Sequence, residues 1–314
     1  MIDLIHVTKR FGEETAVEDI SLSVARGEFC VLVGTSGCGK STTLRMINRL
    51  IEHSEGEIHI EGQQIRAFRG ETLRRRMGYA IQSTGLFPHW TVERNIGLVP
   101  RLLKWPAERV RERVEELMTL LGLAVDEFAG KYPRQLSGGQ AQRVGVARAL
   151  AADPDILLMD EPFGALDPIT RETLQEELRA LQARLQKTIV FVTHDMDEAL
   201  RLADRLVVMH QGRIRQQGHP LALLREPADD FVASLLGGED RGLKEAALLP
   251  VSERMLPLGP RLVARERVVQ HATLREALSI MLWRHAERLT VVDDEDIPIG
   301  ELSLRRLVGA RSHD

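Results

Sequence analysis

The sequence predicts an α/β fold with a mostly parallel sheet, followed by a smaller α+β unit. Three short apolar runs indicate buried strands, at Phe29–Val33, Ile156–Met159 and Ile189–Val192. Apolar residues also recur with helical spacing, at Pro106–Leu123 and Ser137–Ala151. Strands that alternate with helices are typical of α/β proteins whose central sheet is parallel.

Length and composition allow two unequal globular domains. The chain has 314 residues, of which 43% are hydrophobic and 28% are charged, so it can bury a sizeable core. Its formal net charge of −4 predicts no electrostatic affinity for nucleic acid or for anionic lipid. We therefore expect no nucleic-acid partner.

Nothing in the sequence predicts insertion into a membrane or export from the cell. No apolar run approaches the roughly eighteen residues that a membrane-spanning helix needs. Residues Met1–Leu4 lack the basic stretch and the apolar core of a signal peptide. Cys30 and Cys38 are expected to stay reduced in the cytosol. We therefore expect a cytoplasmic protein whose role at a membrane depends on a partner.

A complete phosphate-binding loop follows the first apolar run. Residues 34–41 match G-x-x-x-x-G-K-[ST] at every fixed position, between a predicted strand and a predicted helix, a context that an ordinary glycine-rich turn lacks. The glycines let backbone N–H groups point at phosphate oxygens, and the helix adds its positive N-terminal end. Lys40 is expected to bridge the β- and γ-phosphates, and the Ser41 hydroxyl to bind Mg²⁺. The predicted nucleotide-binding residues of this segment are Gly34, Thr35, Ser36, Gly37, Cys38, Gly39, Lys40, Ser41 and Thr42.

Two carboxylates end the second apolar run. Asp160 and Glu161 follow Ile156–Met159 at the carboxyl end of a predicted strand, where α/β sheets bind ligands. We expect Asp160 to hold Mg²⁺, usually through water, and Glu161 to polarise the attacking water as general base. An apolar strand that ends in Asp-Glu is common by itself, and the complete phosphate-binding loop is what favours the functional interpretation.

A second candidate anion-binding helix start lies at residues 136–140, with the sequence LSGGQ. A serine can cap the helix, two glycines permit close approach to the backbone, and the helix dipole favours phosphate. This segment resembles the signature of the ABC ATPases. The resemblance implies a homodimer in which the signature of one subunit closes over the nucleotide bound to the P-loop of the other. The candidate nucleotide-binding residues here are Ser137, Gly138, Gly139 and Gln140.

Four further residues match positions of the same family. Phe11 resembles the aromatic residue that stacks on adenine, and Gln82 resembles the glutamine that reaches Mg²⁺ and the attacking water. Asp167 resembles the D-loop residue at the dimer interface, and His194 the switch histidine that contacts the γ-phosphate. Singly, Phe11 fits a core position, Gln82 a surface amide and His194 a hydrogen-bonded strand end. Together with the three motifs above, and in the family's order, these residues favour the functional roles. The resemblance thus implies ATP and Mg²⁺ as ligands, with Glu161, His194 and Gln82 catalytic and Ser41, Gln82 and Asp160 metal-binding.

The resemblance covers roughly residues 1–237 and defines the first domain. It implies an ABC-type P-loop NTPase fold with a mixed-sheet core, an antiparallel β-layer that includes Ile2–Val7 and Ile20–Val24, and a helical subdomain. Residues 238–267 contain turn residues without a sustained period, so they predict a linker. Residues 268–314 predict a small separate α+β unit.

A lone cassette without membrane helices is typical of an importer subunit that meets separate permease chains. This assignment implies an ATP hydrolase that binds integral-membrane permease subunits and cooperates indirectly with a periplasmic or extracellular solute-binding protein. It also implies a peripheral location on the cytoplasmic side of the inner (plasma) membrane. A soluble ABC ATPase that works without a permease is the alternative class.

The solute class is predicted from resemblance alone. Residues 81–105 resemble the corresponding segment of osmoprotectant importers, which take up glycine betaine, choline or related quaternary amines. Residues 46–50 and 164–171 resemble the same subgroup. In this family the segment after the Q-loop receives the coupling helix of the permease. The sequence of this segment can therefore vary with the permease that the ATPase binds. An importer of amino acids or another small solute is the alternative.

The C-terminal unit resembles a single CBS repeat. Thr273–Glu276 is a capping box that predicts a helix to about Ala286, and Leu289–Val292 and Ile299–Leu302 predict a hairpin. Arg306 stands where nucleotide-binding repeats place Asp. We expect this unit to pack against its copy in the dimer and to modulate activity without binding an adenosine ligand. A purely structural dimerisation tail is the alternative.

Overall fold

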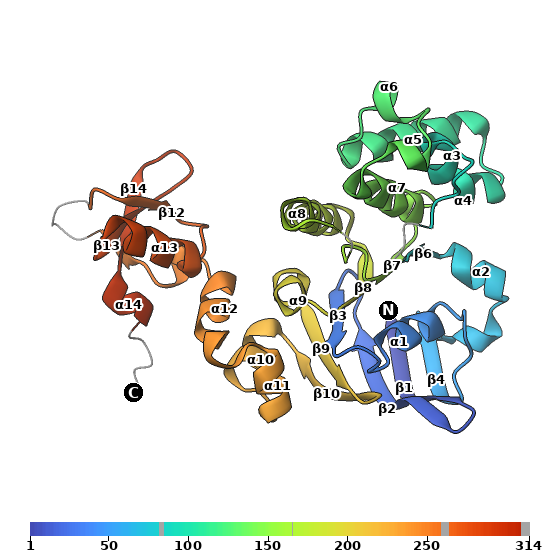
Figure 1. The fold of residues 1–314 in the computed structure, drawn as a ribbon, viewed down its shortest axis with the longest axis horizontal. Helices are drawn as coiled ribbons and strands as arrows, with labels where there is room; N and C mark the ends of the chain where they lie inside the picture. Colours follow the sequence, from blue (N-terminus) through green and yellow to red (C-terminus); the bar gives the residue numbers. More distant parts are fainter. Residues whose placement is uncertain (82–84, 165, 259–263, 309–314) are drawn as a thin grey trace. The chain divides into compact units, whose positions relative to one another are not determined.

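The computed structural model describes residues 1–81, 85–164, 166–258 and 264–308. Its internal contacts divide the chain into two compact units, Met1–Pro220 and Leu221–Asp314. Figure 1 shows the course of the chain through both units. Among the described residues, no helix combines the length and the apolar character needed to cross a bilayer.

A six-stranded sheet forms the centre of the first unit, with the strand order β10-β9-β3-β8-β7-β6. Five of these strands are parallel, and β10 pairs with β9 in the antiparallel sense. The three strands β3, β8 and β7 are buried along their whole length, as the apolar runs predict. The strands are β3 (Phe29–Gly34), β6 (Met77–Ala80), β7 (Ile156–Asp160), β8 (Thr188–Thr193), β9 (Arg205–His210) and β10 (Arg213–Gly218).

An antiparallel layer with the order β2-β1-β4-β5 packs beside this sheet. Helix α1 carries Leu44, Met46 and Ile47, all with no exposed surface, into a core cluster shared by the two sheets. The predicted antiparallel layer is thus present, and it extends to a third and a fourth strand. Its elements are β1 (Ile2–Phe11), β2 (Glu14–Val24), α1 (Lys40–Ile47), β4 (Glu55–Ile60) and β5 (Gln63–Gln64).

Helices α3 to α7 gather into one cluster of the first unit (Figure 1) and form the helical subdomain. The helices predicted at 106–123 and 137–151 are observed as α5 and α7, each shorter by one to three residues at its ends. Helices α8 and α9 connect strands of the central sheet, and α2 lies between β5 of the antiparallel layer and β6. The bounds are α2 (Gly70–Arg75), α3 (Val92–Ile96), α4 (Leu98–Leu102), α5 (Ala107–Leu120), α6 (Val125–Phe128), α7 (Gly138–Leu150), α8 (Pro168–Leu185) and α9 (Met196–Leu202).

The second unit contains a sheet with the order β11-β14-β13-β12. The predicted capping box is present, because Thr273 Oγ1 accepts from Glu276 N at 3.2 Å and Glu276 Oε2 accepts from Thr273 N at 2.7 Å. The predicted hairpin is β13 with β14. The bounds are α10 (Pro220–Arg225), α11 (Asp230–Leu235), α12 (Arg241–Leu248), β11 (Leu256–Pro257), β12 (Arg267–Val269), α13 (Leu274–Arg284), β13 (Arg288–Val292), β14 (Pro298–Ser303) and α14 (Leu304–Val308).

The boundary between the units lies after Pro220, and not after residue 237 as the sequence predicts. The predicted linker 238–267 contains helix α12, and its Leu249 and Val251 are buried in the core of the second unit. Backbone hydrogen bonds explain the difference: Leu274 N donates to Leu249 O at 2.8 Å, and Val251 N donates to Ala272 O at 2.7 Å. This segment therefore belongs to the packed unit, although its sequence shows no period.

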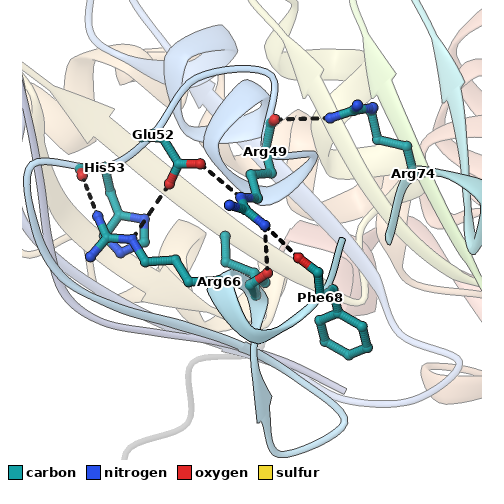
Figure 2. A network of polar contacts seen from close by, with 7 residues as sticks. Arg49, Glu52, His53, Arg66, Phe68 and Arg74 are labelled. Carbon is teal, nitrogen blue, oxygen red and sulfur yellow. Dashed lines mark hydrogen bonds and ion pairs between the residues drawn. The ribbon is translucent and has the colours of Figure 1, made fainter. Parts of the chain in front are cut away.

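A polar network fixes the segment that follows helix α1 (Figure 2). Arg49 donates to Glu52 Oε1 at 2.7 Å and to Phe68 O at 2.7 Å. Arg66 contacts the other oxygen of Glu52 at 3.4 Å and donates to His53 O at 2.8 Å. The network therefore links the end of α1 that is far from the phosphate-binding loop to the segments before β4 and after β5.

The imidazole of His53 lies under this network and is only 2% exposed. Neither of its ring nitrogens has a hydrogen-bonding partner of good geometry among the described residues. Burial lowers the pKa of His53, and the charge of Arg66 lowers it further. The folded chain therefore binds fewer protons at this site than the unfolded chain, so stability is lost as the pH falls below the ordinary value of 6.5.

When the pH is lowered from about 7.5 to about 5.5, we expect the free energy of unfolding to fall less in His53→Leu than in the parent protein. Leucine fills most of the same volume and cannot bind a proton. Urea denaturation at both pH values measures the effect, and His6→Asn is the control because His6 is exposed. An unchanged pH dependence in His53→Leu contradicts the prediction.

Candidate nucleotide-binding site

The phosphate-binding loop connects β3 to α1 and folds around the side chain of Lys40. The Lys40 Nζ donates to Gly34 O at 2.8 Å and to Thr35 O at 2.9 Å, and the residue is 5% exposed. Thr35, Ser36 and Gly37 are exposed at the rim, while Cys38 and Gly39 are buried beneath it. The ammonium group is thus held by backbone carbonyls inside the loop, where it can meet a phosphate that approaches the rim.

Gly39 has a backbone that other residues rarely adopt, with φ at +102°. A Cβ atom there would lie 2.7 Å from Ala16 O and 3.0 Å from Val17 Cγ2. The loop can therefore turn into α1 only because this position has no side chain. Thr42, which follows Ser41 in α1, is half-buried in the first turn of that helix.

Ser41 and Asp160 meet, although 119 positions separate them in the sequence. The Ser41 Oγ donates to Asp160 Oδ1 at 2.7 Å, and Asp160 is 5% exposed at the end of β7. A hydroxyl and a carboxylate are hard oxygen ligands of the kind that Mg²⁺ prefers. Among the described residues, no three His, Cys, Asp or Glu side chains group to hold a metal by themselves. At nucleotide sites Mg²⁺ usually combines one or two protein ligands with phosphate oxygens and waters.

Sequence reasoning missed two residues at this carboxylate. Arg45 Nη2 lies 4.0 Å from Asp160 Oδ2. Burial raises the pKa of Tyr79, and the charge of Asp160 raises it further. The signal for Arg45 was available, since it lies four residues after Ser41 and so on the same face of α1.

Glu161 follows β7 in a strained backbone conformation, with φ at +45°. A residue with a Cβ in this region costs roughly 1–2 kcal/mol. The surrounding structure holds it there, since Glu161 N donates to Val192 O at 2.9 Å on the neighbouring strand β8. His194, just after β8, places its Nδ1 3.2 Å from Glu161 Oε2. The two predicted catalytic residues are thus adjacent, at the carboxyl ends of neighbouring parallel strands.

Phe11 ends β1 with its ring half exposed, at 50%. The Nζ of Lys9 lies 4.6 Å from the centre of that ring. The structure therefore excludes the interpretation of Phe11 as a core residue. An exposed aromatic face is available for stacking on a planar ring.

The LSGGQ segment begins α7 with a capping box. Ser137 Oγ accepts from Gln140 N at 3.2 Å, and Gln140 Oε1 accepts from Ser137 N at 2.9 Å. A Cβ on Gly139 would lie 2.6 Å from Thr170 Cγ2, and one on Gly138 would lie 3.8 Å from Leu166. These glycines therefore pack next to the start of α8.

Asp167 caps that helix, because its Oδ1 accepts from Thr170 N at 3.1 Å. Hydrogen bonds from Thr170 lower the pKa of the Asp167 carboxyl, so it carries its negative charge at neutral pH. The signature segment and Asp167 are thus neighbours within one chain. Gln82, the remaining predicted site residue, lies outside the described residues.

Comparisons with known proteins agree with this geometry. A family model described as "ABC transporter" matches residues 17–164. The chain is 52% identical over 308 residues to the glycine betaine uptake system ATP-binding protein YehX of Escherichia coli K12, covering 98% of this chain and 99% of that protein. It is 48% identical to the glycine betaine/carnitine/choline transport ATP-binding protein OpuCA of Bacillus subtilis 168, covering 98% of this chain and 79% of that protein. Among solved structures, the dimeric structure of MJ0796, a bacterial ABC transporter cassette, matches with a TM-score of 0.64 and 37% identity, covering 70% of this chain and 99% of that one.

The fold and the site thus define a P-loop ATPase of the cassette type. The chain belongs to the ABC transporter family, and it is an ATP-binding subunit that hydrolyses ATP. The family resemblance drawn from the sequence motifs is confirmed.

We expect Gly39→Ala to weaken ATP binding by at least about tenfold. The left-handed backbone lowers the stability of the fold by roughly 1–2 kcal/mol for any residue with a Cβ, whether or not ATP is bound. The clash with Ala16 O displaces the loop itself, and losing about 1.4 kcal/mol of phosphate contacts weakens binding about tenfold. Titration with a fluorescent ATP analogue measures the effect.

Gly62→Ala is the matched control for this experiment. Gly62 has a similar φ of +76°, but a Cβ there would meet nothing within 4 Å. Similar losses of thermal stability in the two variants, with ATP affinity lost only in Gly39→Ala, support the assigned role. Equal ATP affinity in both variants contradicts it.

Proposed function

We propose that this chain powers the uptake of glycine betaine, choline or a related quaternary amine through a separate permease. The observation that carries the proposal is the 52% identity to a glycine betaine uptake ATP-binding protein over 98% of this chain. A second relative at 48% identity is named for the transport of glycine betaine, carnitine and choline. ATP hydrolysis on the cytoplasmic side of the inner (plasma) membrane supplies the free energy, and the chain is peripheral to that membrane.

The assigned roles follow from where the site residues lie. Residues 34–42 cradle the phosphates of ATP, with Lys40 between the β- and γ-phosphates. Ser41 and Asp160 would hold Mg²⁺, which neutralises the charge that develops on the phosphates. The exposed ring of Phe11 stacks on adenine. The family resemblance assigns Gln82 to the same metal and to the attacking water, which it would contact when both are bound.

Glu161 acts on the attacking water as general base, and His194 contacts the γ-phosphate. The distance of 3.2 Å between the two side chains allows His194 to meet the γ-phosphate while Glu161 meets the water that attacks it. The strained backbone of Glu161 supports this role, since such strain persists at sites where the surrounding contacts determine the geometry. A general base typically contributes roughly a hundredfold to ten-thousandfold to a rate.

A homodimer completes each ATP site in this proposal. The relative MJ0796 has a dimeric structure. Ser137, Gly138, Gly139 and Gln140 of one subunit would close over the nucleotide of the other, with Asp167 at the interface. Within one chain these glycines approach the start of α8, so the signature and Asp167 can act on the partner as one surface.

The permease contact is assigned to an aromatic turn at Phe87–Trp90. Phe87 and Trp90 stack with ring centres 4.5 Å apart, and Phe87 is 38% exposed. Buried Asn95 holds the turn, since its side chain accepts from Phe87 N at 2.8 Å and donates to Trp90 O at 3.1 Å. A rigid, partly exposed aromatic cluster is suited to binding a helix of a membrane partner.

The second unit is assigned a CBS-like regulatory role in the dimer. Its β12–α13–β13 segment, with the parallel pairing of β12 and β13, supports this proposal. Arg306 in place of Asp supports a role without an adenosine ligand. Tight binding of AMP or ATP to the second unit would contradict that part of the proposal.

ATPase activity in proteoliposomes that contain the permease and the solute-binding protein tests the function. We expect glycine betaine or choline to stimulate hydrolysis. Stimulation by another solute alone would keep the importer class and discard the quaternary-amine substrate. Hydrolysis that never responds to a permease would favour a soluble ABC ATPase.

We expect Glu161→Gln to lower kcat by roughly a hundredfold to ten-thousandfold and to retain ATP binding. The amide keeps the size of the side chain but is a poor base. Single-turnover hydrolysis and nucleotide titration on the full chain measure the two effects. Normal hydrolysis by this variant would show that another group is the base.

A further inference from the structure

We propose that Arg171 is a positioning residue that locks the D-loop and the switch-histidine segment into one arrangement around Glu161. The inference rests on the catalytic roles proposed above for Glu161 and His194. Arg171 lies in the first turn of α8, and the family motifs identified in the sequence leave it without a role.

The guanidinium group of Arg171 bridges two segments that come from different strands. Its Nη2 donates to Leu166 O at 3.1 Å, one residue before Asp167. Its Nη1 donates to Asp195 Oδ2 at 3.2 Å, one residue after His194. The planar guanidinium fork fixes the directions of both bonds, so the two segments cannot shift independently while the bonds last.

Asp195 gives this bridge a rigid anchor. Its Oδ1 accepts from Asp197 N at 3.0 Å and from Glu198 N at 3.2 Å, which caps helix α9. Its own N–H donates to Thr193 Oγ1 at 3.0 Å. One carboxylate oxygen of Asp195 therefore caps helix α9, and the other binds Arg171. Any movement of the switch-histidine segment, His194 and Asp195, strains either the helix cap or the contact with Arg171.

The contacts form a closed ring that includes Glu161. Gly164 N donates to Glu161 O at 3.3 Å, and Leu166 N donates to Phe163 O at 3.2 Å, so the turn after Glu161 leads directly to the carbonyl that Arg171 binds. On the other side, His194 Nδ1 lies 3.2 Å from Glu161 Oε2. Arg171 thus closes the ring between Leu166 and Asp195, which follows His194.

The ring has a consequence for catalysis. Asp167 is proposed to meet the partner subunit, whereas His194 and Glu161 are proposed to meet the γ-phosphate and the water. A shift at the dimer contact reaches Glu161 through the turn that follows it, and it reaches His194 through Arg171 and Asp195. Misplacing a catalytic group by about 1 Å can lower a rate roughly a hundredfold, so losing this bridge is expected to act on kcat.

Helix α8 supplies a matched control two turns further on. Arg179 donates to Leu202 O at 3.2 Å and to Asp204 Oδ1 at 2.6 Å, so it also bridges one carbonyl and one carboxylate. Asp204 accepts from Phe29 N at the start of β3, which is the opposite end of the sheet from the site. Arg171→Gln and Arg179→Gln therefore remove the same kind of contact at two different places.

We expect Arg171→Gln to lower kcat for ATP roughly tenfold to hundredfold and to change the KM for ATP by less than about twofold. We expect Arg179→Gln to have the same thermal stability as Arg171→Gln and to keep kcat within about twofold of the parent protein. Arg171→Lys should restore part of kcat, because an ammonium group reaches one partner but lacks the fork. The assays use the full chain.

A double-mutant cycle gives the second readout. Asp195→Asn preserves the helix cap, since Asn caps as well as Asp, but it removes the charge that Arg171 binds. The double variant Arg171→Gln/Asp195→Asn should be no slower than the slower single variant. Additive losses of kcat, or equal kcat in Arg171→Gln and Arg179→Gln, would overturn the proposal.

Glu161→Gln separates the failure of this inference from the failure of the proposed mechanism. If Glu161→Gln hydrolyses ATP normally, the catalytic roles themselves are wrong. If Glu161→Gln is inactive while Arg171→Gln behaves as Arg179→Gln, the catalytic roles stand and only the positioning role of Arg171 is discarded.

Discussion

The parallel order β3-β8-β7 is the constraint on which the rest of the site depends. All three strands are fully buried, so their register is fixed by the core on both faces. Because parallel strands end at the same edge of a sheet, the phosphate-binding loop, His194 and the Asp160–Glu161 pair emerge side by side. The hydrogen bond of 2.7 Å from Ser41 Oγ to Asp160 Oδ1 forms because this strand order brings the two residues together.

The apolar interior also supports the strained part of the site. Phe163, two residues after Glu161, packs on Phe191 of β8 with ring centres 5.8 Å apart, and Phe191 packs on Phe29 of β3 at 5.9 Å. All three rings are buried, and Phe163 itself belongs to the turn that follows Glu161. A backbone that costs roughly 1–2 kcal/mol persists because burial of this aromatic stack offsets it. Core packing and catalytic geometry are therefore parts of one arrangement.

Helix α8 contacts several elements of the site that have different proposed roles. The signature segment packs against the start of α8, Asp167 caps α8, and Arg171 of α8 reaches the segment that carries His194. One helix thus connects the elements proposed to meet the partner subunit with those proposed to meet ATP. Such a connection allows subunit closure and hydrolysis to proceed together, as the ATP-driven cycle of an importer requires.

The sequence by itself determined the family, the α/β fold, the order of the motifs and the helix caps at Ser137 and Thr273, because each of these depends on local patterns of residues. It did not determine that residues 241–251 belong to the second unit, because their pairing with Ala272 and Leu274 is non-local. The sequence also did not predict the strained backbone of Glu161 or the contacts of Arg171 with Leu166 and Asp195. Only the tertiary structure decided these features, because the strand order determines which distant residues lie at the same edge of the sheet. The chain has 42 Lys and Arg residues, and the local sequence around any one of them does not identify its partner.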